Sequence, residues 1–341
     1  MNEKQINKRK EDHIRINAEE DIASLITNGL DDYYFDHQAL PELDLDDVDI
    51  TTTIFGKKQN APIFISSMVG GSPESYEINL RFARAAQKYR IGMGVGSQRI
   101  GLALPDTMRY FNIRAEAPDI LLFANIGAIQ LNNSVTIHDC VKLVDEIGAN
   151  GLILHLNPLQ EALQLEGNTN FAGLLNKIEK LCSTINVPVV VKEVGWGVSG
   201  RTAKYLNDAG VAAIDVAGAG GTSWSEVEKY RLKDDISRNV AASFRDWGIS
   251  TAQSILNVKE NTNDLIIFAS GGLRSGVDVA KCIALGADYC GFAGKLFRAA
   301  VISEEKVNDT VEEIMRGLQL SMFAAGTGTI SLLQKTTLRK R

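Results

Sequence analysis

The chain has 341 residues, of which 45% are hydrophobic and 23% are charged, so it can bury a core of ordinary size. Its formal net charge of −6 argues against a general nucleic-acid-binding protein, which needs a basic face to neutralise phosphates. The sequence has no run of about 18 apolar residues and its polar start lacks the apolar core of a secretory signal, so we expect a cytoplasmic protein without a membrane span.

The cysteines also favour a reducing compartment. The sequence contains Cys140, Cys182, Cys282 and Cys290, with no CxxC pair among them. Three of the four fall in apolar helical or strand contexts, where a reduced thiol is the simplest interpretation. They therefore predict neither a metal site nor a redox pair.

Short apolar, β-branched runs recur along the chain, with amphipathic segments such as 78–89, 137–147 and 275–285 between them. Such runs are typical of strands buried on both faces, as in a parallel sheet flanked by helices. Strict alternation of eight strands with helices favours a closed (β/α)8 TIM barrel over an open, doubly wound sheet. The predicted strands lie at 62–65, 91–95, 121–124, 151–154, 187–191, 212–216, 265–268 and 288–292.

We expect one barrel domain over 61–330, preceded by an N-terminal extension over 1–60 and followed by a basic C-terminal tail over 331–341. The extension holds a segment, 51–57, that reads as a small hairpin. The sixth and seventh strands are about 50 residues apart, which is longer than a usual crossover. The stretch 224–258 between them is predicted to contain an extra helix that covers the active site.

Polar and glycine-rich clusters follow nearly every predicted strand. In a barrel of this kind, functional residues gather at the C-terminal ends of the strands. The clusters lie at 66–71, 96–99, 125–127, 155–161, 192–195, 218–224, 269–274 and 293–295.

The clusters after the seventh and eighth strands, Ser270-Gly271-Gly272-Leu273-Arg274 and Ala293-Gly294, predict a phosphate site. Glycines let backbone N–H groups approach a phosphate, and the following helix N-terminus adds a favourable dipole. Glycine turns also arise from tight strand-to-helix connections, but two such clusters on neighbouring strands favour the phosphate interpretation. Thr222 could add a hydroxyl donor to the same anion.

Charged residues at two other strand ends are candidates for catalysis. Lys192 ends an apolar strand, where it could stabilise an anion on a bound ring or form a Schiff base; a structural pair with Glu193 is the alternative. In the 155–161 cluster, His155 could transfer protons or be a satisfied structural histidine, and Glu161 could hold Mg²⁺. The basic run 9–13 is a solvated helix face by default, although it could fold over the barrel mouth.

Together the motifs RKEDH at 9–13, GVGSQR at 94–99, HLNPLQE at 155–161, VKEVG at 191–195, GGTSW at 220–224 and ASGGLR at 269–274 resemble the type 2 isopentenyl-diphosphate isomerases. The likeness runs from residue 9 to near the C-terminus. It implies an enzyme that interconverts isopentenyl and dimethylallyl diphosphate with reduced FMN and Mg²⁺, with NADPH as the usual reductant. It also implies a homotetramer or octamer.

The resemblance implies specific roles for residues in these motifs. FMN would contact Ser67, Met68, Val69, Ser97, Asn125, Lys192, Thr222, Gly271, Gly272, Leu273, Arg274, Ala293 and Gly294. The substrate would contact Arg9, Lys10, His13, Ser97, Gln98, Arg99, His155, Asn157 and Gln160, and Glu161 would carry Mg²⁺. The catalytic group would comprise Gln160, His155, Lys192, Trp224 and Glu228, with reduced flavin acting as acid and base.

Two residues depart from the family's pattern. Val69 stands where threonine is usual near flavin N5, and Ala217 stands where many members have serine. Loss of the threonine hydroxyl changes flavin tuning only if that hydroxyl, rather than the backbone N–H, makes the contact. Loss of the serine should weaken one polar contact to FMN.

Three other functions compete with the isomerase interpretation. A 2-hydroxy-acid oxidase needs a histidine base in the later loops, and the four histidines, His13, His37, His138 and His155, include none in the loops after the fifth to eighth strands. A nucleotide dehydrogenase would need a cysteine in 218–224, which contains none. A non-catalytic flavin- or phosphate-binding barrel would keep the glycine loops but has no need of the HLNPLQE and RKEDH motifs.

Overall fold

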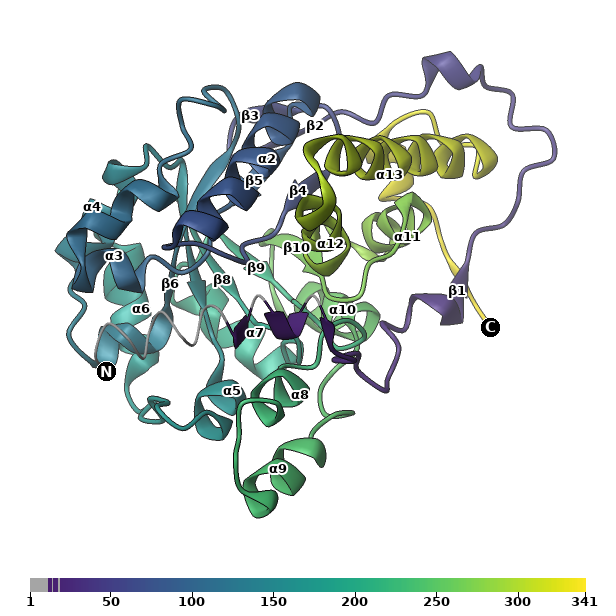
Figure 1. The fold of residues 1–341 in the computed structure, drawn as a ribbon. Helices are drawn as coiled ribbons and strands as arrows, with labels where there is room; N and C mark the ends of the chain where they lie inside the picture. Colours follow the sequence, from purple (N-terminus) through teal and green to yellow (C-terminus); the bar gives the residue numbers. More distant parts are fainter. Residues whose placement is uncertain (1–11, 14, 18) are drawn as a thin grey trace.

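The computed structural model describes residues 12–13, 15–17 and 19–341, and its central feature is a closed barrel of parallel strands (Figure 1). Each strand pairs in parallel with the next one in the chain, and the last strand pairs with the first to close the barrel. The predicted (β/α)8 fold is thereby confirmed. The strands are β4 (Ile63–Ile65), β5 (Gly92–Gly94), β6 (Leu122–Gly127), β7 (Gly151–His155), β8 (Val189–Lys192), β9 (Ala213–Asp215), β10 (Ile266–Ser270) and β11 (Tyr289–Phe292).

Helices cover the outside of this barrel, and their sequences explain where they begin. In the helix that follows β4, the Ser72 hydroxyl accepts from the Ser75 N–H and Pro73 occupies the first turn, a combination that favours a helix start. The helices between or after the strands are α2 (Pro73–Tyr89), α3 (Arg99–Ala103), α4 (Ile137–Glu146), α5 (Pro158–Leu163), α6 (Leu174–Cys182), α7 (Gly200–Asp208), α10 (Thr251–Asn261), α11 (Gly276–Leu285), α12 (Gly294–Ile302) and α13 (Glu304–Ala324).

A short hairpin closes the amino-terminal end of the barrel. Its strands are β2 (Thr52–Ile54) and β3 (Lys57–Gln59), and the turn between them places Phe55 and Gly56 at φ 47° and 75°, as a two-residue hairpin turn requires. Phe55 packs against Phe123 and Phe268 inside the barrel, with ring centroids 6.3 and 6.1 Å away. The predicted hairpin is confirmed, and it leaves the opposite rim open for a ligand.

The N-terminal extension and the C-terminal tail pair with each other at residues 33–34 and 339–340. Strand β1 (Tyr33–Tyr34) pairs antiparallel with β12 (Arg339–Lys340), and the Arg341 N–H donates to the Asp32 carbonyl at 2.8 Å. The basic tail predicted from residue 331 onward therefore includes a strand that is held by the extension.

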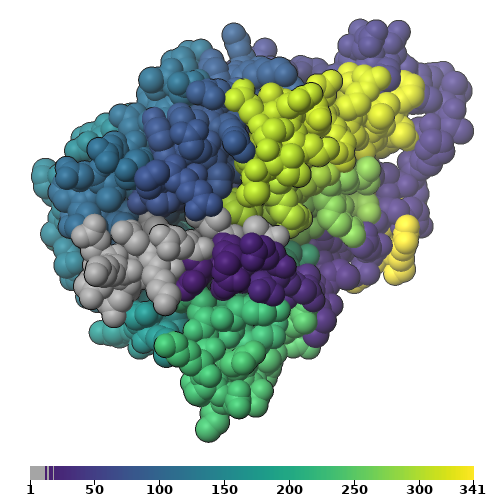
Figure 2. All heavy atoms as spheres, viewed as in Figure 1, coloured from purple at the N-terminus to yellow at the C-terminus, as the bar shows by residue number. Residues whose placement is uncertain are grey.

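The long connection between β9 and β10 contains two short helices before the barrel helix α10. These are α8 (Trp224–Lys229) and α9 (Asp235–Ala242), where the sequence predicted one extra helix. The described part of residues 12–24, here called the N-terminal arm, lies against this connection (Figure 2). The Ser24 N–H donates to the Gly221 carbonyl at 2.8 Å, and Ala23 forms a bridge with Thr222.

Two further expectations concern the whole chain. All four cysteines carry free thiols, and Cys140, Cys282 and Cys290 are buried. Within the described residues, no helix has the length and apolar character needed to cross a bilayer.

We expect the hairpin β2–β3, which closes the amino-terminal end of the barrel, to contribute measurably to the free energy of unfolding. Ile54 is buried inside the barrel, whereas its neighbour Thr53 is exposed. We expect Ile54→Ala to lower the free energy of unfolding in urea by about 2–4 kcal/mol, because it leaves a cavity among aromatic rings. The control Thr53→Ala should change the free energy of unfolding by less than about 0.5 kcal/mol. Equal losses in the two variants would contradict the packing of Ile54 inside the barrel.

Candidate active site

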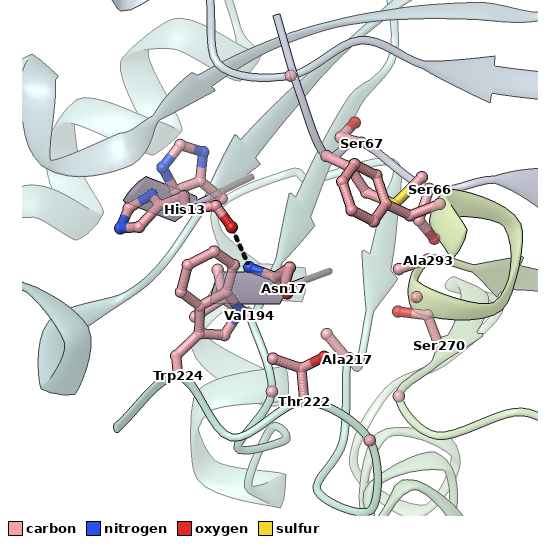
Figure 3. A pocket seen from close by; sticks show the side chains of 18 of the residues that line it. His13, Asn17, Ser66, Ser67, Val194, Ala217, Thr222, Trp224, Ser270 and Ala293 are labelled. Carbon is pink, nitrogen blue, oxygen red and sulfur yellow. Dashed lines mark hydrogen bonds between the residues drawn. The ribbon is translucent and has the colours of Figure 1, made fainter. Parts of the chain in front are cut away.

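A cavity of about 890 Å³ opens at the C-terminal ends of the barrel strands (Figure 3). Loops after all eight strands contribute to its wall, which is the arrangement that the strand-end clusters predicted. His13 and Trp224 lie on one side, and Ser66, Ser67 and Ala293 lie on the other. The predicted residues in the wall are His13, Ser67, Met68, Val69, Ser97, Arg99, Asn125, His155, Asn157, Gln160, Glu161, Lys192, Thr222, Trp224, Gly271, Gly272, Leu273, Arg274, Ala293 and Gly294.

The glycine loops pack backbone against backbone. Gly271 and Gly272 have φ angles of 107° and 70°, which favour glycine. A Cβ atom on Gly271 would lie 2.1 Å from the Gly218 carbonyl oxygen, and one on Gly272 would lie 2.2 Å from that of Gly220. The loops after β9 and β10 can therefore approach each other only with glycine at these positions. Thr222, Gly271 and Gly272 all line the cavity beside this packing.

Two hydroxyl oxygens in the cavity wall make no hydrogen bond within the described residues. The hydroxyl oxygens of Ser66 and Ser67 are buried and have no hydrogen-bond partner among the described residues. Buried hydroxyls without partners are uncommon, and both serines line the cavity. This pair of hydroxyls indicates a place where a bound molecule contributes hydrogen-bonding groups.

Asn125 and His155 form a contact between neighbouring strands. The Nδ1 atom of His155 lies 2.9 Å from Oδ1 of Asn125. Because an amide oxygen only accepts, Nδ1 carries the proton, and this contact selects the tautomer of the ring. The histidine is thus oriented by a buried amide at the rim.

Lys192 has a different partner from the one considered from sequence. Its Nζ atom donates to the backbone carbonyl of Glu193 at 2.8 Å and lies 3.6 Å from Oδ2 of Asp215.

The Glu193 carboxylate has other partners: it accepts from the N–H groups of the next three residues, Val194, Gly195 and Trp196, at 2.6–2.8 Å. A side-chain pair between Lys192 and Glu193 is therefore not made.

Burial raises the pKa of Glu193 to about 7, although the three N–H donors and the charge of Lys192 act in the opposite direction. The carboxylate shapes the loop after β8. It thereby determines where Lys192 and Val194 enter the cavity.

A chain of hydrogen bonds links the N-terminal arm to the loop after β7. His13 Nε2 lies 3.2 Å from Glu228 Oε1, and Gln160 Nε2 donates to the same oxygen at 3.0 Å. Asn157 Nδ2 donates at 3.1 Å to both Gln160 and Glu161. The second oxygen of Glu161 accepts from the Asn168 N–H at 2.6 Å.

Glu228 is the charged centre of this chain, although it lies behind the cavity wall. Burial alone would raise its pKa, but the hydrogen bond and charge of His13 and the charge of Arg231 outweigh burial and lower the pKa to about 2. Arg231 donates to Glu228 at 2.6 Å and lies 3.7 Å from Asp12 of the arm. These contacts hold Glu228 as a carboxylate.

Trp224 stands at the start of α8 beside the arm. Its ring meets the His13 ring edge to face, with centroids 5.3 Å apart. One face of the cavity near Gln160 is therefore aromatic.

The structure does not bring every predicted residue to the cavity. Gln98 is fully buried; its amide nitrogen donates to the Leu143 carbonyl and its amide oxygen accepts from the Asn125 N–H, so its side chain supports the wall rather than facing a ligand. Both ends of the Gln98 amide are already used, and its predicted contact with substrate stays a prediction. Arg9 and Lys10 lie outside the described residues.

Sequence reasoning missed two charged residues that complete the site. Asp215, the partner of Lys192, was visible as an acidic residue inside the apolar run 212–216. Arg231, the partner of Glu228, carried no signal in the sequence, because a lone arginine in a charged insertion is normally solvated.

Comparison with known proteins agrees with this arrangement. The family described as FMN-dependent dehydrogenase matches residues 155–340. The isopentenyl-diphosphate delta-isomerase of Rickettsia prowazekii is 49% identical over 327 residues, which are 96% of each chain. The enzyme of the same name from Nostoc sp. is 48% identical over 331 residues, covering 97% of this chain and 95% of its own.

Solved structures of lower sequence similarity share the fold. A putative lactate oxidase from Pediococcus acidilactici has a TM-score of 0.71 at 17% identity, covering 99% of this chain and 93% of its own. A flavocytochrome b2 variant has a TM-score of 0.69 at 20% identity, covering 96% and 82%. At these identities the likeness concerns the barrel alone.

The environment of Glu193 predicts a pH dependence of stability. The unfolded chain loses the proton near the ordinary pKa of 4.5, whereas the folded chain keeps it until about 7. Between these values the folded state binds more protons, so stability falls as pH rises. The melting temperature of the wild-type chain should therefore decline relative to that of Glu193→Gln across this interval and then run parallel to it.

The control for this measurement is Glu179→Gln, which alters an exposed carboxylate on α6. It should track the wild-type chain at every pH. A constant difference between wild type and Glu193→Gln over the interval would rule out the raised pKa.

Proposed function

Because the chain belongs to the FMN-dependent, type 2 family of isopentenyl-diphosphate delta-isomerases, we propose that it interconverts isopentenyl diphosphate and dimethylallyl diphosphate. One observation carries this proposal: a single rim cavity combines glycine loops suited to a phosphate with the polar cluster His155, Asn157 and Glu161. The cofactors that we propose are FMN and Mg²⁺, with NADPH as the reductant. A cytoplasmic location and a homotetramer or octamer stay predictions.

The residues present fit FMN. The buried hydroxyls of Ser66 and Ser67 need partners, and the cavity wall includes the glycine loop 271–274 and the start of α12 at Gly294. The phosphate would be held by 271–274, Ala293 and Gly294, with Thr222 beside it, and the ring by 67–69, Ser97, Asn125 and Lys192. When bound in its reduced form, FMN would supply the group that gives and takes the proton at carbon.

The substrate diphosphate would be held on the β5 and β7 side of the cavity. Arg99 supplies positive charge, and His155 and Asn157 lie in the same part of the wall. The Asn157 amide oxygen is buried without a hydrogen-bond partner in the described part of the chain. His13, Arg9 and Lys10 would add donors from the arm.

Glu161 would bind Mg²⁺ together with the substrate. Its two oxygens already accept from Asn157 and Asn168. No group of three or more His, Cys, Asp or Glu side chains suited to a metal occurs among the described residues. Since Mg²⁺ prefers one or two carboxylates with phosphate oxygens and water, the diphosphate would complete its coordination.

The alkene would lie beside Trp224 and Gln160. Protonation of the alkene gives a carbocation-like species that an aromatic face stabilises and that water would capture. Glu228, behind Gln160, would hold the amide in place and serve the proton route. The arm and α8 cover this side and limit the entry of water.

The two departures from the family pattern fall in the same cavity. The Val69 carbonyl accepts from the Gly96 N–H and from Asn79, so its backbone is fixed without a hydroxyl. The Ala217 N–H donates to Asp215 at 3.2 Å. We infer that both positions alter the polarity near the flavin and leave its binding intact.

Oxidation of a 2-hydroxy acid is the second candidate, since the structural relatives include a lactate oxidase. The pair His13 and Glu228 is a histidine–carboxylate contact beside the cavity, of the kind that a base would need. The loops after β8 to β11 hold no histidine. Lactate with FMN in air should therefore give no hydrogen peroxide; peroxide formation would favour the oxidase over the isomerase.

The direct test of the isomerase uses the purified chain with FMN, NADPH and Mg²⁺ under anaerobic conditions. Isopentenyl diphosphate should be converted to dimethylallyl diphosphate, as followed by chromatography. Binding of FMN without conversion would favour a non-catalytic flavin-binding barrel.

Glu161→Gln should raise the Mg²⁺ concentration needed for half-maximal activity by about tenfold or more, because one anionic ligand is lost. The retention of FMN should not change, since Glu161 lies away from the glycine loops. Glu179→Gln on exposed α6 is the control, and an unchanged Mg²⁺ requirement in Glu161→Gln would remove Glu161 from the metal site.

A further inference from the structure

Asp215, which no sequence motif singled out, joins three neighbouring strands at the rim. It ends β9, is fully buried, and stands opposite Lys192 of β8 in the parallel register. Its Oδ1 atom accepts from the hydroxyl of Ser270 on β10 at 2.7 Å and from the Ala217 N–H at 3.2 Å. One carboxylate oxygen is therefore used to connect β9 with the residue that precedes Gly271.

The other oxygen faces Lys192. Oδ2 of Asp215 lies 3.6 Å from Lys192 Nζ and has no hydrogen-bond partner in the part of the chain that the structure describes. A buried charge of this kind is costly unless an opposite charge compensates it. The Lys192 side chain, only 11% exposed, supplies that charge.

Lysine needs such a partner in this position. Its long side chain has several rotatable bonds, so a contact is needed to hold the amine in one direction. The Glu193 carbonyl accepts one hydrogen bond from Nζ, which limits the direction of the amine but adds no full charge. Among the described residues, the ion pair of Lys192 is made with the Asp215 carboxylate, which supplies the negative charge.

We propose that Asp215 is a positioning residue: its carboxylate directs the Lys192 amine into the cavity through their ion pair, and it ties Lys192 through Ser270 to the glycine loop after β10. This inference rests on the proposed function, in which Lys192 faces the flavin ring. The distance between the ring-facing amine and the phosphate loop is then set by one carboxylate rather than by the backbone alone.

A purely structural role would make a different prediction for Asp215→Asn. The amide oxygen of the new side chain would still accept from Ser270 and Ala217, so the connection between β9 and β10 survives the substitution. Only the compensation of the Lys192 charge is lost. The variant therefore separates the two roles.

The test measures Lys192 directly in the FMN-free chain. The rate at which acetic anhydride labels Lys192 at mildly alkaline pH is compared, by peptide mass spectrometry, with that of the exposed Lys204 in the same sample. In Asp215→Asn we expect this ratio to rise about tenfold, because loss of the ion pair releases the amine from its fixed position and makes it more available to the reagent. A change of less than about twofold would overturn the proposal.

Asp288→Asn is the matched control. Asp288 is a half-buried carboxylate that accepts from the Ile267 N–H at the opposite end of the barrel. The Lys192 labelling ratio should stay at the wild-type value in this variant. An equal rise in both variants would indicate general loosening and would overturn the specific role of Asp215.

If Asp215→Asn does not fold, the double variant Lys192→Met/Asp215→Asn decides. Recovery of a cooperative melting transition supports the proposed interaction, because the double variant no longer buries the Lys192 charge without a partner. Failure to recover the transition overturns the proposal. The labelling uses neither FMN nor isopentenyl diphosphate. A negative result therefore leaves the proposed activity standing, and an inactive enzyme with the expected labelling leaves the role of Asp215 standing.

Discussion

The structure depends on one constraint, the parallel pairing of every barrel strand with the next. This pairing directs the carboxyl ends of all strands to one rim, so residues far apart in the chain become neighbours there. Lys192 and Asp215 stand side by side because β8 and β9 run in the same direction and register. The hairpin around Phe55 fills the other end and leaves the rim as the route into the barrel interior.

Charges at the rim are arranged in two groups with different tasks. Lys192 and Asp215 are held by barrel strands, where the backbone fixes both ends of the pair. Glu228, His13 and Arg231 are held by α8 and the N-terminal arm, which are additions to the barrel. The first group belongs to the barrel, and in the second group the contacts of His13 and Asp12 join the arm to the insertion. A ligand between the two groups would touch both.

The alternation of apolar runs with amphipathic segments was enough to predict the barrel, because each buried parallel strand leaves a continuous apolar run. The candidate site followed from the same rule, since strand ends must meet, and the cavity wall includes most of the predicted residues. The direction of the Gln98 side chain was not evident from sequence, because its motif neighbours Ser97 and Arg99 face the cavity while its own amide turns inward to Leu143 and Asn125. Asp215 and Arg231 were missed because their importance depends on partners that only the folded chain supplies. The second inserted helix was missed because short polar helices have no distinctive period.

The pairing of Tyr33 and Tyr34 with Arg339 and Lys340 carries a practical consequence for anyone handling this chain. The final residues are a structural clasp, and the segment they fasten leads directly to the arm at the rim. A substitution that disturbs this ladder, such as Arg339→Pro, would therefore act on a segment that leads to the cavity from the far side of the sequence. Trimming those last residues would remove this ladder from the segment, which would then be held by contacts such as the buried Leu30 and the hydrogen bond from Asn28 to the Gly272 carbonyl.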